Sequence, residues 1–163
     1  IIDIDTKMTD VKKVMSEDTD FTKVFDEATQ SAQRFGQTIS DTMDAYIEFA
    51  RQGFKGEELK DLADATLVAS NVAEVEAGKM AEYMTASMIQ WDMQSNQAMS
   101  VIDKWNEISN NYATTVDKLA EGQAKAGATA RAMQLDFDQL NAVIGTVTAS
   151  TKQSGKLLCP FIQ

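Results

Sequence analysis

The side chains whose type and spacing could do chemistry in this chain are carboxylates. Glu57, Asp61 and Asp64 recur at helical spacing, so a helix would place them on one face, with Glu58 beside them. Such a set could bind a divalent cation or serve as a general acid and base. Acidic residues are also stabilised at the start of a helix by the helix dipole. We favour this second interpretation, a solvated helix start.

The other acidic groups are weaker candidates. Glu74 and Glu76 form a separate pair, and residues 3–5 and 136–138 resemble the opening of a calcium-binding loop. Neither loop-like segment has the glycine and the final glutamate at the required distances. Histidine, the commonest general base and metal ligand, is absent from the sequence. We therefore predict a protein that is not an enzyme, with no catalytic residue, metal site or cofactor.

Charge and composition exclude several other classes. The net charge of −10 repels phosphate backbones and anionic membranes, and no apolar run is long enough to span a bilayer. We predict neither a nucleic-acid nor a membrane partner for this segment. The only cysteine, Cys159, cannot form an internal disulfide, and we interpret it as incidental. The chain begins with Ile1 rather than Met, so we expect a fragment of a longer protein.

The pattern of apolar residues predicts an all-α fold. One proline and eight glycines in 163 residues favour helices, and apolar positions recur with a period near 3.6. We predict a compact bundle of about seven short helices with no sheet and no fixed-period repeat. The expected domains are a poorly defined N-terminal arm over residues 1–18, a helical domain over 19–155 and an irregular tail over 156–163. The expected helix starts lie near these residues: Thr19 or Asp20, Ser40 or Asp41, Gly56, Asn71, Ser95 or Asn96, Thr114 or Thr115, and Asp136.

Two stretches are candidates for a surface that binds a partner. The first is a stripe of methionines above a tryptophan, which can repack easily but is more often ordinary core. The second is a run of small residues, which suits close helix packing within the chain or self-association, and the sequence leaves both open. The residues of the two stretches are Met80, Met84, Met88, Trp91, Ala124, Gly127 and Ala130.

Several short elements occur in an order that resembles a known family. They include residues 49–53, Asp103-Lys104 with Asn106 and Asn110, and residues 140–144. Over about residues 48–155 the chain resembles the conserved N-terminal region of phage tail tape measure proteins. The resemblance implies a non-enzymatic module of a phage or prophage tail, involved in tail assembly and tail-length determination. It also implies tail-tube proteins and tail assembly chaperones as partners, possible self-association, and a location in the virion tail and, during assembly, the host bacterial cytoplasm.

The resemblance has limits that leave alternatives open. The first 45 residues show no likeness, and the proline at 160 stands where the family is expected to continue through a glycine turn into a helix. Even a fully helical chain of this length would reach only about 245 Å, so we expect this segment to anchor or oligomerise rather than to measure. One alternative is a bacterial helical adaptor or secretion-associated interaction module. Another is a carboxylate-based metal or hydrolase site completed elsewhere in a longer chain.

Overall fold

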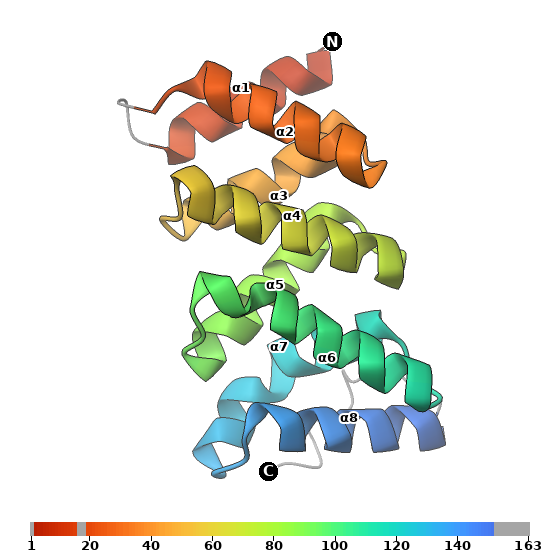
Figure 1. Ribbon diagram of the computed structural model, residues 1–163. Helices are drawn as coiled ribbons and strands as arrows, with labels where there is room; N and C mark the ends of the chain where they lie inside the picture. The colour runs from red at the N-terminus through yellow and green to blue at the C-terminus, as the bar shows by residue number, and fades with distance from the viewer. Residues whose placement is uncertain (1, 16–18, 152–163) are drawn as a thin grey trace. The chain divides into compact units, whose positions relative to one another are not determined.

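The computed structural model describes residues 2–15 and 19–151, and over these ranges the protein is all-α with no strand (Figure 1). The prediction of the fold class is confirmed. The helices are α1 (Ile2–Val14), α2 (Phe21–Phe35), α3 (Ile39–Arg51), α4 (Gly56–Ala73), α5 (Ala77–Trp91), the short 3₁₀ helix η1 (Ser95–Gln97), α6 (Ala98–Asn111), α7 (Val116–Ala132) and α8 (Phe137–Thr151). The helix beyond the seven expected is α1, which lies in the segment treated as an arm. Its apolar pattern is weak, because Val11 is its one fully buried apolar residue among those described.

The chain forms two compact units, each with its own packing. The first comprises Ile1–Asn71 and Val75–Glu82, and the second comprises Val72–Glu74 and Tyr83–Gln163. Within the first unit α1 and α3 form one layer and α2 and α4 another, as Figure 1 shows. Within the second unit α7 lies behind α6 and α8. The sequence-derived domain boundaries stay a prediction, and the tail over 156–163, with Cys159, lies outside the described residues.

Several helix starts follow the expected capping chemistry. The Asp20 carboxylate accepts a hydrogen bond from the backbone N–H of Lys23 at 3.1 Å, and Asp136 accepts one from the N–H of Gln139 at 2.8 Å. The Gln139 side chain accepts in turn from the Asp136 N–H at 2.9 Å, which completes a capping box. These two caps are where the sequence predicts them.

Three expected caps are wrong. Ser95 and Asn96 lie within η1, so the residue before η1 is Gln94 and the residue before α6 is Gln97. Helix α3 is capped by Thr38, whose hydroxyl accepts from the backbone N–H of Asp41 at 3.0 Å, rather than by Ser40 or Asp41. Asn71 starts no helix, because α4 continues through it to Ala73. Its side-chain amide instead donates to the backbone carbonyl of Phe35 at 2.8 Å and so ties α4 to the end of α2. Asn frequently caps helices, so the sequence alone does not distinguish a capping Asn71 from one that bonds to another helix.

The helices recur at a nearly constant interval that the sequence analysis did not find. Helices α3, α5 and α7 begin at residues 39, 77 and 116, and α6 and α8 begin at residues 98 and 137. Helix α4 departs from the interval, because it begins 35 residues after α2 and 42 residues before α6. The buried positions recur in the same register. Five buried positions of α3 are 42, 43, 46, 49 and 50, and the positions 38 residues later in α5 are buried too (80, 81, 84, 87 and 88). The positions a further 39 residues on, in α7, are also buried (119, 120, 123, 126 and 127). Apart from Ala81 and Ala120, the residue identities differ at these positions, so the repeat of about 39 residues is one of burial rather than of amino-acid type.

Five helices end in the same way, although only two of them end at a glycine. At each end a residue with positive φ lies beyond the helix, and the next N–H donates to a carbonyl in the last turn. Gly36 and Gly53 hold this position after α2 and α3. Glu74, Asp92 and Gln134 hold it after α4, α5 and α7, with φ of 53°, 58° and 65°. A side chain in this left-handed region is disfavoured by contact between Cβ and the backbone.

We therefore expect the Gln134→Gly variant to be more stable than the parent protein. Relief of the left-handed strain exceeds the extra flexibility of glycine in the unfolded chain, and the net gain should be about 0.5–1 kcal/mol. Chemical denaturation followed by circular dichroism measures it. Gln52→Gly is the control, because Gln52 caps α3 with φ of −83° and glycine there should destabilise. Equal effects of the two variants would contradict the interpretation.

Candidate functional site

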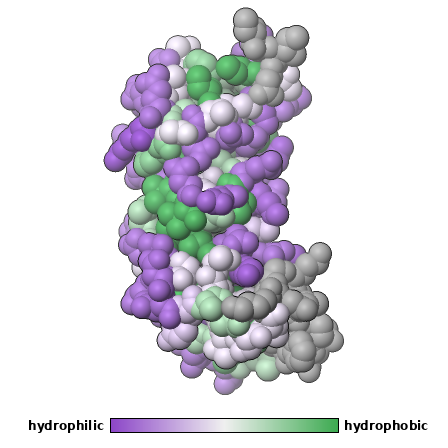
Figure 2. All heavy atoms as spheres, turned by 90° about the vertical axis from the view of Figure 1, so that its right-hand side faces the viewer, coloured by the Kyte–Doolittle hydropathy of each residue, from purple (hydrophilic) through white to green (hydrophobic). Residues whose placement is uncertain are grey.

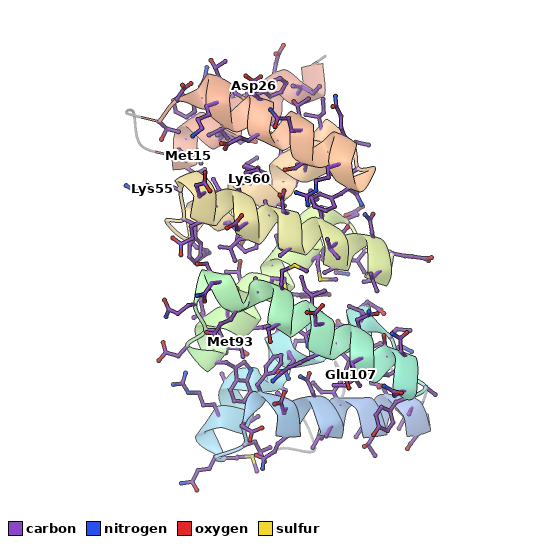
Figure 3. All side chains as sticks on the ribbon, viewed as in Figure 1. Met15, Asp26, Lys55, Lys60, Met93 and Glu107 are labelled. Atoms are coloured by element: carbon purple, nitrogen blue, oxygen red, sulfur yellow. The ribbon has the colours of Figure 1, made fainter. Side chains whose placement is uncertain are left out.

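An acidic groove of about 550 Å³ lies between α2 and α4 in the first unit. Figure 3 shows Asp26 on α2 and Lys60 on α4, the two helices that form its walls. Five of its nine lining residues are acidic and two are lysines. The lining residues are Asp20, Thr22, Lys23, Asp26, Glu27, Gln30, Glu57, Lys60 and Asp61.

Of the carboxylates that the sequence places on one helical face, Glu57 and Asp61 line this groove and Asp64 does not. Asp64 is largely buried and accepts hydrogen bonds from the Ser31 hydroxyl and from the Lys60 ammonium, the latter at 2.8 Å, with the Arg34 guanidinium at 3.9 Å. The hydrogen bond to Asp64 raises the pKa of Lys60. Glu57 is exposed to solvent. Lys60 therefore neutralises Asp64 within α4, and the Ser31 hydroxyl and the Arg34 guanidinium link Asp64 to α2, which is a structural role.

No metal-binding group forms from the acids in the described ranges. Among residues 2–15 and 19–151, no three carboxylates or cysteines come together in an arrangement that could hold an ion. Glu58 and Asp61 are exposed like Glu57, and Glu74 lies at the left-handed end of α4. These acids are therefore exposed to solvent or bonded to residues of neighbouring helices, and those described do not meet around a common cation.

Tyr46 has the most strongly perturbed titration among the described residues. Burial in the core of the first unit raises the pKa of its phenol well above the ordinary value, and the negative charge of Asp64 adds to the effect. A phenol with a raised pKa stays protonated at neutral pH, so it is a poor base and a poor nucleophile. We interpret Tyr46 as a core residue of α3.

The second unit is organised around a buried network of amides and tryptophans. The Gln123 amide donates to the backbone carbonyl of Phe137 at 3.0 Å and to Asn141 Oδ1 at 2.8 Å, and its oxygen accepts from the indole N–H of Trp91 at 2.9 Å. Asn141 Oδ1 also accepts from the Trp105 indole at 3.2 Å. Gln123, Asn141 and Trp105 are fully buried. The network therefore joins α5, α6, α7 and α8.

Sequence reasoning missed the two amides of this network. Gln123 and Asn141 lie on otherwise apolar helix faces, next to Ala120 and Leu140. A buried polar side chain needs a partner, so such a residue on an apolar face is a signal for an interhelical hydrogen bond. Its partner could not be read from the sequence, because it lies 18 residues away on the next helix.

The residues predicted for partner binding are mostly buried. Met80, Met84 and Met88 lie in the core, which is the interpretation that the sequence favoured for methionines at helical spacing. Trp91 is half-buried and bonded to Gln123. Contact of this set with a partner stays a prediction. On α5 the most exposed large apolar side chain is that of Ile89, and at the end of α7 it is that of Met133.

The small-residue stretch packs inside the second unit. Gly127 and Ala130 are buried and Ala124 is half-buried. A Cβ on Gly127 would lie 2.0 Å from the side-chain oxygen of Gln90, and the Gln90 amide donates to the carbonyl of Ala124 at 2.8 Å. These contacts bring α7 close to the last turns of α5. They support internal packing, the first of the two alternatives, and self-association through these residues stays a prediction.

Polar and apolar residues are distributed unevenly on the surface. On the face drawn in Figure 2 hydrophilic residues predominate, and hydrophobic ones gather in separate patches. The exposed large apolar residues in the described ranges are Val72, Ile89, Met99, Tyr112, Met133 and Val143. No helix among the described residues has the length and apolar character needed to cross a membrane.

We expect Gln123→Met to destabilise the protein by about 2–4 kcal/mol. The substitution keeps the volume but leaves the Trp91 indole and the Phe137 carbonyl without their partners in the interior. Trp91 and Trp105 are the two tryptophans of the chain, so a shift in the wavelength of tryptophan emission should accompany the loss of stability. Gln33→Met at an exposed position of α2 is the control and should change stability by less than about 0.5 kcal/mol. If the Gln123→Met variant were as stable as the parent protein, the network would contribute nothing to the free energy of unfolding.

Gly122 should tolerate no side chain, whereas Gly145 should. A Cβ on Gly122 would lie 2.9–3.1 Å from three side-chain atoms of Ile144, and the nearest contact at Gly145 is 3.4 Å from Ile108. We expect Gly122→Ala to cost about 1–3 kcal/mol through overpacking, and Gly145→Ala to be neutral or stabilising. Thermal and chemical denaturation measure both. The double variant Gly122→Ala, Ile144→Val should lose less than the sum of its parts, and strict additivity would contradict the proposed contact.

The fold and the contacts define a class before any comparison is made. The described residues form an all-α protein in which buried amides, ion pairs and tryptophans hold helices together, and its acids are solvated or paired. These features define a protein of the all-α class with a net negative charge.

The chain belongs to the phage-related minor tail protein family, whose model matches residues 26–157. The match begins upstream of residue 48, where the likeness seen in the sequence starts. Membership gives the protein a structural role in a phage tail, with other tail proteins as its partners and the virion tail as its location. No solved structure matches the chain.

Proposed function

We propose that this protein is the N-terminal module of a phage tail tape measure protein, acting in tail assembly and tail-length determination. The observation that carries the proposal is the family match over residues 26–157, together with the element order from residue 49 to residue 144 that resembles tape measure proteins. The proposed partners are the tail tube and the tail assembly chaperones. Assembly would take place in the host bacterial cytoplasm.

Within such a protein the module would anchor or oligomerise rather than measure length. The longest helix, α4, has 18 residues and spans about 27 Å. Each helix is followed by a short turn and the next helix folds back, as along α2 and α3 in Figure 1. A folded-back chain adds far less length per residue than an extended helix. The measuring part of the parent protein therefore lies outside these residues in our proposal.

Deletion of residues 26–151 from the gene in its phage or prophage tests this role. We expect tails to be absent or of uncontrolled length in electron micrographs, because the assembly step fails. Tails shortened by about 190 Å, the length of the deleted residues as one helix, would instead identify a ruler. Normal tails and normal infectivity would favour the adaptor alternative. The surface variant Gln33→Met is the control and should build tails of normal length.

A further inference from the structure

We draw no further inference here: the strongest candidate, the acidic groove between α2 and α4 that Asp26, Glu27 and Asp61 line, is a cluster of carboxylates for which nothing in the part of the chain that the structure describes shows what ligand or partner it would take.

Discussion

The constraint on which the rest of the structure depends is the burial of α3, α5 and α7 on most of their circumference. Seven of the nine residues from 42 to 50 are buried, and the corresponding parts of α5 and α7 follow nearly the same pattern. A helix that is apolar over more than one face is stable in water only when other elements cover it. Helix α4 is buried to the same extent, with seven of the nine residues from 62 to 70 buried, whereas α2, α6 and α8 carry narrower buried stripes and wider polar faces that meet solvent.

Because these helices are so thoroughly buried, a polar group in the interior lowers the stability of the fold unless it is hydrogen-bonded. Gln123 corresponds in register to Tyr46 and Met84, and it is tolerated because all of its polar atoms are bonded to Trp91, Phe137 and Asn141. Ser31 and Asp64 satisfy each other in the first unit. An amide left unpaired in this setting would cost more than the net value of its bond. The networks therefore fix which helices meet, while the apolar contacts supply most of the stability.

How much of this could be predicted from the sequence differs between local and long-range features. Helix identity and the caps at Asp20 and Asp136 follow from spacing within a few residues, and the prediction holds there. Helix α1 and the tie from Asn71 to Phe35 depend on contacts made after folding. The Thr38 cap is as local as the other two, and the prediction missed it by choosing Ser40 or Asp41 as the cap. The carboxylates at Glu57, Asp61 and Asp64 share a face in the sequence, but Asp64 turns to Ser31 and Lys60 because α2 packs there. The repeat was hidden for a related reason, since burial recurs while residue type does not.

The same repeat also shows how charges are placed between neighbouring helices of each unit. Where α6 meets α8, the register position carries Lys104 against Asp138, and where α2 faces α4 it carries Glu27 in a groove that also contains Lys60. These charges suit a neighbour of fixed sequence within the chain, because each requires its complement. Val143, at the corresponding position of α8, carries no charge and is 36% exposed, so a surface packed against it would need no complementary charge.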